Sequence, residues 1–319
     1  MNIYILAPQN HKSGGAELSH QLCHAINTLT DVPAYMCYVD INAPFDKALG
    51  IDVPAPDAYE VYETRHIIGS SKLNTADSLI VFPEGLTLSM PYYPNAKKVL
   101  WWMSVDNYVI STKEANLPFI RDNVVLHLYQ SYYSKDYVEK KIPGAKGLHL
   151  SDYINDQHGK FIYPAQFREN IGLYNPAKGY EEIKALLEKA SWLKWVPLIN
   201  LDIPHMVLMM EAGKIYVDFG NHPGKDRIPR EAAADGCCVI TNKKGAAAFE
   251  GDVPIPERYK FESPADSLEE IDALLHDICD NFAEHQAQFE SYRQMIASEK
   301  AAFNSDTVKF VEYCKQKLF

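Results

Sequence analysis

The sequence predicts an α/β protein made of two Rossmann-like domains, and three observations support this. The chain has 319 residues, which at roughly 150 residues per domain suits two domains. Residues 2–7, a loop with Gly14 and Gly15, a helical pattern and an apolar run over 32–39 follow one another as in a βαβ unit, which implies a parallel sheet covered by helices. Strand and helix patterns alternate again beyond Arg168.

Short apolar runs in the first half have the composition of strands buried in a parallel sheet. They cover residues 78–82, 98–103, 124–129 and 147–151. The polar stretch 155–159 lacks apolar periodicity and is a suitable linker. We therefore expect the first domain to span residues 1–155.

The second half repeats this organisation. Strand patterns at 171–174, 195–198, 215–219 and 237–241 alternate with helix patterns at 180–189, 203–212 and 229–235. From Ser267 the chain is mostly helical. Capping residue types at Asn304–Asp306 lie beside an apolar helical face, and such residues commonly begin helices. We therefore expect a second domain over 156–303 and a new helix over 304–319.

The composition excludes several classes of protein. Lys and Arg number 31 against 42 Asp and Glu, a net charge of −11, which disfavours binding to the phosphates of a nucleic acid. No apolar run approaches the ~20 residues that cross a bilayer, and the N-terminal segment lacks the pattern of a secretion signal. The six cysteines include no CxxC pair, as expected in a reducing compartment. We expect a cytoplasmic protein.

Familiar catalytic motifs are absent. The chain contains no G-x-G-x-x-G, G-x-x-x-x-G-K-[ST], G-x-S-x-G or H-E-x-x-H, so dinucleotide, P-loop, serine hydrolase and zinc peptidase chemistry lack support. His20, Cys23 and His24 share one helix face at a spacing that zinc ligands use. No fourth ligand lies nearby, so we expect a half-buried helix face and no metal site.

Three segments point to a known family. They are ILAPQNHKSGGAELS over 5–19, NPAKG over 175–179, and DFGNHPGKDRIPREAAADGCCVIT over 218–241. In this order they resemble the nucleotide-sugar glycosyltransferases of the GT-B fold, especially the retaining family-4 group. The resemblance implies two Rossmann-like domains facing across a cleft, with a final helix that packs back on the first domain. It also implies a nucleotide-sugar donor and a glycan or lipid-linked acceptor.

The resemblance assigns Gly14 and Gly15 to the glycine pair that lies close to donor and acceptor. Glycines let the backbone approach a ligand, and the following helix presents N–H groups to phosphate. A tight strand-to-helix turn explains the same residues without a ligand.

Two further residues match the family's donor site. Lys178 matches a lysine whose ammonium balances the departing diphosphate, and Glu231 matches a glutamate that accepts hydrogen bonds from both ribose hydroxyls. A solvated lysine and a glutamate paired with Arg227 or Arg230 are the alternatives.

The chain departs from the family at two points. Gly172–Tyr174 lacks the family's arginine, and Pro223 stands eight residues before Glu231, where the family has an acidic residue. Because the leaving charge must be balanced, we expect Lys225 and Arg227 to take over part of that role.

The predicted chemistry needs no resident cofactor. Without a DxD-type pair in a suitable loop, the chain should rely on cations and helix N-termini instead of a metal ion. A retaining transferase can let the leaving phosphate take the acceptor proton, whereas an inverting enzyme needs a base. His11 and Asp106 are the best placed candidates for that base, although His11 also fits a solvent-exposed loop.

We therefore predict a hexosyltransferase-like enzyme, retaining and metal-independent, of surface polysaccharide synthesis. A nucleotide-sugar epimerase using His11, His222 or Asp226, and a non-catalytic glycosyltransferase-like subunit, are the alternatives. A modest basic run leaves open a peripheral contact with the inner membrane face, against the preferred interpretation as a solvated helix face. It comprises Lys135, Lys140, Lys141 and Lys146.

Overall fold

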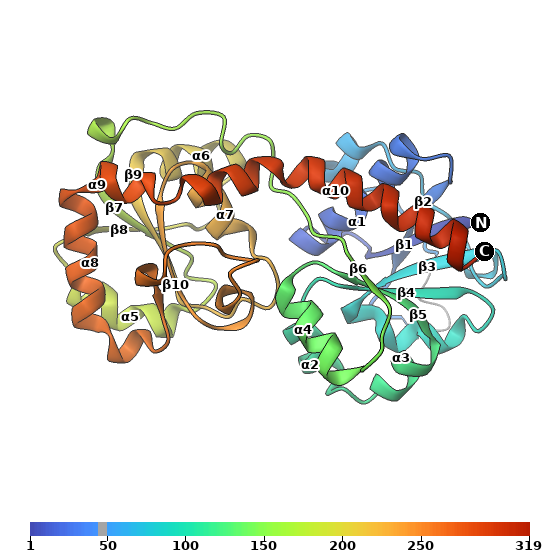
Figure 1. The fold of residues 1–319 in the computed structure, drawn as a ribbon. Helices are drawn as coiled ribbons and strands as arrows, with labels where there is room; N and C mark the ends of the chain where they lie inside the picture. The colour runs from blue at the N-terminus through green and yellow to red at the C-terminus, as the bar shows by residue number, and fades with distance from the viewer. Residues whose placement is uncertain (44–49) are drawn as a thin grey trace. The chain divides into compact units, whose positions relative to one another are not determined.

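The computed structural model describes residues 1–43 and 50–319. The chain divides into two compact units (Figure 1). The first unit comprises Met1–Asp152 and Ala301–Phe319, and the second comprises Tyr153–Lys300. Each unit has its own parallel sheet and its own apolar core. In the part of the chain that is described, no helix combines the length and apolar character needed to cross a bilayer.

The first unit contains a six-stranded parallel sheet in the order β2-β1-β3-β4-β5-β6. Its strands are β1 (Asn2–Pro8), β2 (Ala34–Val39), β3 (Ser78–Pro83), β4 (Lys97–Trp102), β5 (Val124–Tyr129) and β6 (Gly147–His149). Every strand predicted for this half is present, with ends within two residues of those expected. The strands are apolar and largely buried, because a parallel sheet is covered on both faces.

Four helices lie between the described strands of the first unit, and three of them begin at serine caps. The four are α1 (Gly14–Leu29), α2 (Val105–Thr112), α3 (Leu117–Asn123) and α4 (Tyr132–Lys141), with 3₁₀ turns over Asp57–Tyr62, Ser70–Lys72 and Glu84–Tyr92. Ser13, Ser104 and Ser131 cap α1, α2 and α4 by accepting hydrogen bonds from first-turn N–H groups. These caps fix where each helix starts relative to the strand before it.

The second unit contains a five-stranded parallel sheet in the order β11-β10-β9-β7-β8. Its strands are β7 (Glu169–Tyr174), β8 (Lys194–Pro197), β9 (Gly213–Asp218), β10 (Cys238–Asn242) and β11 (Lys260–Phe261). Strands β7 to β10 correspond to the four predicted strands. The two-residue β11 was not predicted, because so short a pairing carries no periodic signal.

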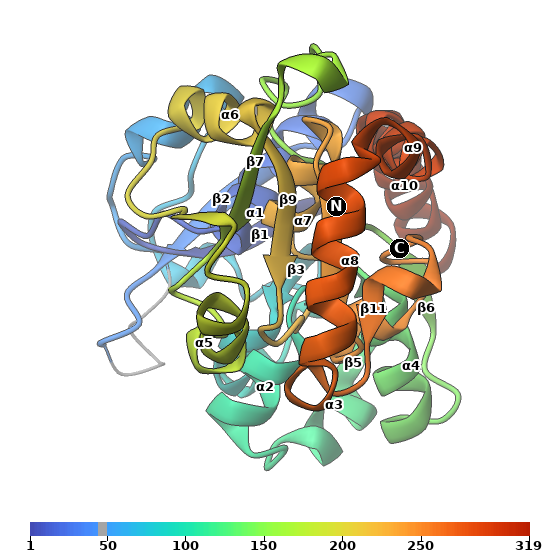
Figure 2. The same cartoon turned by 90° about the vertical axis from the view of Figure 1, so that its left-hand side faces the viewer.

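Helices cover both faces of this sheet. They are α5 (Tyr180–Lys189), α6 (Ile203–Ala212), α7 (Arg227–Ala234), α8 (Leu268–Asp280), α9 (Phe282–Ala287) and α10 (Glu290–Lys317). Short 3₁₀ turns lie over Ala165–Phe167, Gly245–Ala248, Glu257–Tyr259 and Pro264–Asp266. Helix α5 packs with α8, and α6 packs with α7 (Figure 2). This pairing is the one that right-handed crossovers produce when the strand order reverses at β7.

The prediction that a new helix begins at residue 304 is wrong. Helix α10 runs without a break through Asn304–Asp306, because its buried apolar positions begin upstream, at Tyr292 and Ile296, and continue through Phe303. Capping residues start a helix only where the chain is not already helical, and inside α10 they are ordinary helix positions.

The last part of α10 belongs to the first unit. There Lys315 pairs with Asp31, and the Lys97 ammonium lies 3.8 Å from the centre of the Phe319 ring. Phe303, Phe310 and Val311 lie buried along the same stretch of the helix, supplying its apolar contacts.

Candidate functional site

Three loops of the second unit meet at the carboxyl ends of its strands. They are residues 175–179 after β7, 219–226 after β9 and 243–248 after β10. The Asn242 side-chain amide donates to the carbonyl oxygens of Phe219 and Gly220, at 2.6 and 2.8 Å. The N–H of Ala246 donates to the carbonyl of His222, at 2.8 Å. This edge of an open α/β sheet is where such folds bind ligands.

Two glycines allow the first two loops to touch. Gly179 has a φ of +74°, which strains any residue with a side chain, and a Cβ there would lie 2.5 Å from the Gly220 nitrogen. A Cβ on Gly220 would lie 2.7 Å from Cγ of Lys178. The glycines therefore let the Lys178 side chain extend over the 219–226 loop.

Lys178 is half-buried and its ammonium pairs with the Asp226 carboxylate. Asp226 also accepts a hydrogen bond from Nδ1 of His222, at 2.8 Å. Burial raises the pKa of Asp226, but the bond from His222 and the charge of Lys178 outweigh it, so its pKa lies below the ordinary value. Lys178 is therefore a positioned cation, held by a carboxylate that stays ionised.

Lys225, which the sequence analysis expects to help balance the diphosphate, pairs with a carboxylate of α10 in the structure. Its side chain is 8% exposed, and its ammonium lies 2.6 Å from Oε1 of Glu299 in α10. Arg230 reaches Oε2 of the same glutamate at 2.7 Å and donates to the Lys225 carbonyl at 2.9 Å. The buried Glu299 carboxylate thus connects α10 to the 219–226 loop and to α7, and it balances the charge of Lys225.

Glu231 lies in the second turn of α7, with its side chain 13% exposed. Burial raises the pKa of Glu231 above its ordinary value, against the charges of His158, Arg227 and Arg230, which lower it. Nε2 of His158 lies 3.9 Å from Oε1 of Glu231. Arg227 is the first residue of the same helix and precedes Glu231 by about one turn.

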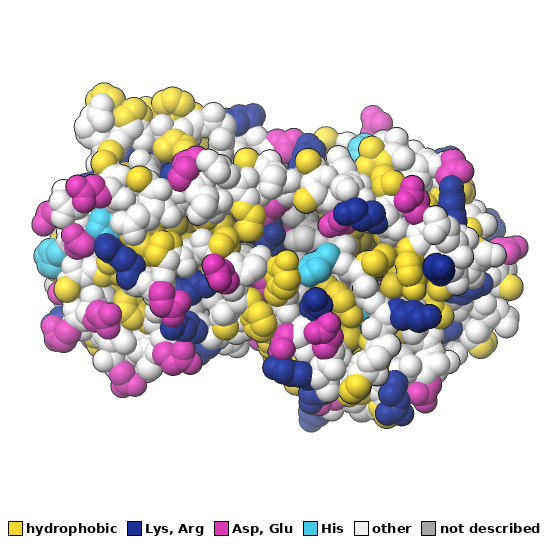
Figure 3. Space-filling view, viewed as in Figure 1, with side chains coloured by type: hydrophobic (Ala, Val, Ile, Leu, Met, Phe, Trp, Pro, Cys, Tyr) yellow, Lys and Arg dark blue, Asp and Glu magenta, His cyan; other side chains and the backbone are white. Residues whose placement is uncertain are grey.

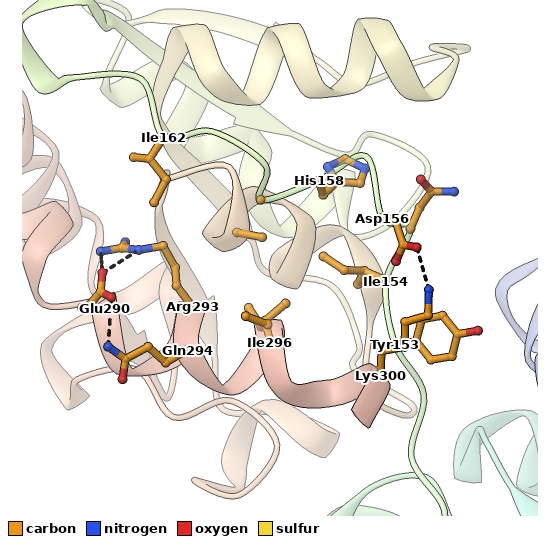
Figure 4. Close-up of a pocket in the computed structure, with 14 residues that line it drawn as sticks. Tyr153, Ile154, Asp156, His158, Ile162, Glu290, Arg293, Gln294, Ile296 and Lys300 are labelled. Atoms are coloured by element: carbon orange, nitrogen blue, oxygen red, sulfur yellow. Dashed lines mark hydrogen bonds and ion pairs between the residues drawn. The ribbon is translucent and has the colours of Figure 1, made fainter. Parts of the chain in front are cut away.

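The sequence did not single out His158. It lies in segment 153–162, which also forms one wall of a cavity of about 440 Å³ whose other wall is the start of α10 (Figure 4). In that cavity Arg293 pairs with Glu290, and Lys300 pairs with Asp156. A buried histidine preceded by no motif gives no signal in one sequence.

The glycine pair of the first unit opens α1. Gly14 is exposed, and a Cβ on Gly15 would meet only the Met103 thioether, at 3.8 Å, an ordinary contact. Packing within this unit therefore does not require glycine at 15. The Tyr59 hydroxyl fixes the turn by donating to the Ser13 carbonyl, at 3.0 Å. His11 lies exposed in the same loop.

Asp106 lies in the first turn of α2 and accepts a hydrogen bond from the Tyr133 hydroxyl, at 3.0 Å. Beside it lies a carboxyl that sequence reasoning missed. Glu84 directly follows β3, is 5% exposed, and accepts a hydrogen bond from the Met103 N–H at 3.1 Å. Burial raises the pKa of Glu84 to about 7, although N–H groups at the start of α2 lower it. An acidic residue directly after a buried parallel strand was the available signal.

The face of α1 that carries His20, Cys23 and His24 has ordinary hydrogen-bond partners. His20 contacts the Ala16 carbonyl at 2.8 Å and the Tyr38 hydroxyl at 3.1 Å, and His24 contacts the Tyr62 carbonyl at 2.9 Å. Among residues 1–43 and 50–319, no group of three or more His, Cys, Asp or Glu side chains is arranged to hold a metal ion.

The basic run of the first unit is largely paired. Lys135 lies 3.9 Å from Glu139, Lys140 lies 2.7 Å from Asp136, and Lys141 lies 3.0 Å from Glu114. Figure 3 shows acidic and basic side chains interspersed over the visible face. These pairs reduce the net charge that the run presents.

No protein-family model matches the chain, and no curated protein matches it in sequence. Solved structures do match it over nearly its whole length. HepE from Anabaena, in complex with UDP-glucose, matches with a TM-score of 0.68 at 12% identity, over 98% of this chain and 99% of that one. Sucrose-phosphate synthase from Thermosynechococcus elongatus matches with a TM-score of 0.65 at 14% identity, over 99% and 98%. The chain has the GT-B fold.

A trehalose-6-phosphate synthase, OtsA, also matches this chain, with a TM-score of 0.61 at 10% identity, over 99% of both chains. HepE was also solved in complex with UDP, and with UDP and glucose. At these identities the likeness establishes the fold, and the chemistry must come from the residues of this chain.

Proposed function

We propose that this GT-B protein is a glycosyltransferase that moves a sugar from a nucleoside diphosphate sugar to an acceptor hydroxyl. One observation carries the proposal. A positioned lysine, Lys178, and a buried carboxylate, Glu231, lie in neighbouring elements at the carboxyl edge of the second sheet. A diphosphate needs a cation, and a ribose needs an acceptor for two hydroxyls, so this pair suits a nucleotide.

Two helix N-termini add to the positive potential at this edge. Gly179 and Asp226 are the N-cap residues of α5 and α7, and the side chain of neither accepts a hydrogen bond from the first turn. First-turn N–H groups without such caps attract anions. We propose that these N–H groups, Lys178 and Arg227 together stabilise the departing diphosphate.

The reaction that suits these residues needs little acid–base chemistry from the protein. As the bond between the anomeric carbon and the phosphate oxygen breaks, negative charge develops on the leaving phosphate. The oxygen released from the sugar can then take the proton of the acceptor hydroxyl. We propose a retaining, metal-independent transfer to a glycan or lipid-linked acceptor of surface polysaccharide synthesis. Support for retention and for this acceptor class comes from the resemblance of residues 218–241 to family-4 enzymes. Asp106 and His11 are the candidate bases if the reaction inverts.

The test is donor turnover by the full-length protein. Incubation with UDP-, GDP- and other nucleotide sugars, with release of the nucleoside diphosphate as the readout, should identify a donor. Lys178→Ala and Glu231→Gln should each lower kcat/KM at least tenfold, and Lys184→Ala, an exposed lysine of α5, should not. Release unaffected by both site variants would contradict the assignment.

A donor-binding subunit without catalysis is the second candidate, because Pro223 replaces the family's acidic residue and Lys178 already has a carboxylate partner. Saturable binding of a nucleoside diphosphate, without turnover of any donor, would identify that function.

A further inference from the structure

His158 lies in the segment that enters the second unit, and its side chain contacts the end of α7. Its side chain is 2% exposed, and its Nδ1 lies 2.6 Å from Oδ2 of Asp235. The other oxygen of Asp235 accepts a hydrogen bond from the Gly159 N–H, at 2.8 Å. Because an ionised carboxylate only accepts hydrogen bonds, Nδ1 of His158 carries a proton. The imidazole is thereby fixed in both tautomer and direction.

The fixed ring presents its second nitrogen to Glu231, whose Oε1 lies 3.9 Å from Nε2. Glu231 and Asp235 are four residues apart and share one side of α7. His158 thus touches one carboxylate with each ring nitrogen. Figure 4 shows its position on the 153–162 segment, at the edge of the cavity.

The charges around this ring favour its cationic form. Burial lowers the pKa of His158, but Asp235 and Glu231 outweigh it, so the pKa lies above its ordinary value. Two cations of α10, Arg293 and Lys300, line the cavity beside His158.

Each of those cations is already paired, Arg293 with Glu290 and Lys300 with Asp156. Arg227 and Arg230, which lie on α7 itself, lower the pKa of Glu231, whereas Asp235 raises it. His158 is the cation that a second segment of the chain contributes to Glu231.

We propose that His158 is a positioning residue for the donor's ribose: oriented by Asp235, its imidazolium keeps the Glu231 carboxylate ionised and aimed at both ribose hydroxyls. The proposal rests on the proposed function and narrows it. The donor is a ribonucleoside diphosphate sugar, because a 2′-deoxyribose offers Glu231 one hydroxyl fewer. It also predicts that donor affinity falls as the pH falls, since Glu231 binds hydroxyls best as a carboxylate.

The decisive variant is His158→Asn. The asparagine amide keeps a donor to Asp235 near the position of Nδ1 and removes the charge that faces Glu231. The dissociation constant of the full-length protein for UDP, GDP and their 2′-deoxy analogues is measured between about pH 5 and pH 8. His205→Asn is the matched control: His205 Nδ1 also lies 2.6 Å from an aspartate, Asp202, but the pair is exposed at the start of α6.

The expected result is a weaker complex at the acid end of the range. Without His158, protonation of Glu231 begins at higher pH, so Kd for the ribonucleotide rises at the acid end of the range. The rise is at most about tenfold for each pH unit by which the pKa of Glu231 increases. Near pH 8 the two proteins bind alike, and His205→Asn matches the wild type throughout. In the Glu231→Gln background, His158→Asn changes neither Kd nor its pH dependence.

A spectroscopic measurement guards against a folding defect in the His158 variant. In Glu231→Gln, the NMR titration of the His158 ring should move to lower pH, since one of its two carboxylates is lost. An unmoved titration, or an unchanged acid limb in His158→Asn with normal ribonucleotide binding, would overturn the positioning role and leave the proposed function standing. If the wild-type protein binds no ribonucleoside diphosphate, the proposed function fails, and this inference fails with it.

Discussion

Replacing the buried acid Glu84 by glutamine should change how the stability of the first unit depends on pH. Glu84 is 5% exposed and accepts a hydrogen bond from the Met103 N–H at the entrance to α2. Glutamine has nearly the same shape and keeps an oxygen to accept that bond, but it cannot ionise. The substitution therefore isolates the cost of placing a charge at this position.

The magnitude follows from the pKa of Glu84, which burial raises from 4.5 to about 7. Between these values the folded protein holds a proton on Glu84 that the unfolded chain has released, so stability falls as the pH rises. At about 1.4 kcal/mol per pH unit, the full loss is about 3 kcal/mol and is complete above about pH 7. The glutamine variant should not show this loss.

Urea denaturation of both proteins at a series of pH values tests this. The variant should match the wild type near pH 4.5 and exceed it by about 3 kcal/mol near pH 7.5. The comparison uses only the difference between the two proteins, so the titration of other groups cancels. Glu60→Gln, at an exposed glutamate of the same unit, supplies the control. A constant difference between Glu84→Gln and wild type over this range would refute the reasoning.

Three further predictions concern the second unit and the reaction. Glu299→Ala removes the partner of two buried cations and should lower the free energy of unfolding by about 3–5 kcal/mol in urea denaturation, whereas Glu312→Ala, exposed on the same helix, should change it little. Gly179→Ala forces a Cβ against Gly220, so it should weaken nucleoside diphosphate binding in calorimetry, whereas Gly144→Ala, with positive φ but open space, should not. Donor turnover should survive excess EDTA, and strict dependence on Mn²⁺ would contradict the metal-independent proposal.

The strands and most helices were predictable because their signals are local. Four-to-seven-residue apolar runs identify buried parallel strands, and the bounds of α5 and α6 agree with the helical periodicity. The start of α10 was not predictable in this way. Asn304–Asp306 has the residue types of a cap, but the buried positions on both sides keep the helix continuous. The local preference of Asn, Ser and Asp for helix starts was outweighed by the packing of the buried side chains before and after them.

The partners of the charged residues could not be predicted, because pairing depends on which segments meet in space. Lys225 and Glu299 are 74 positions apart, and His158 and Asp235 are 77 apart. A charge in a loop looks the same in the sequence whether it faces a ligand or a buried carboxylate. Lys225 illustrates this: nothing in its loop sequence indicates that its ammonium pairs with Glu299 of α10.

The pairing of Lys178 with Asp226 bears on how this chain manages without an acid at Pro223. Asp226 lies three residues later, at the start of α7, so a carboxylate remains in the loop, but it holds the lysine. If this loop is the donor site that we propose, the empty site contains no unpaired half-buried ammonium, which would be costly. When a diphosphate binds, it adds acceptors to a cation already in place, so little side-chain entropy is lost. The His222 hydrogen bond holds Asp226 in position, so in the proposed function we expect the buried imidazole of His222 to support the donor site.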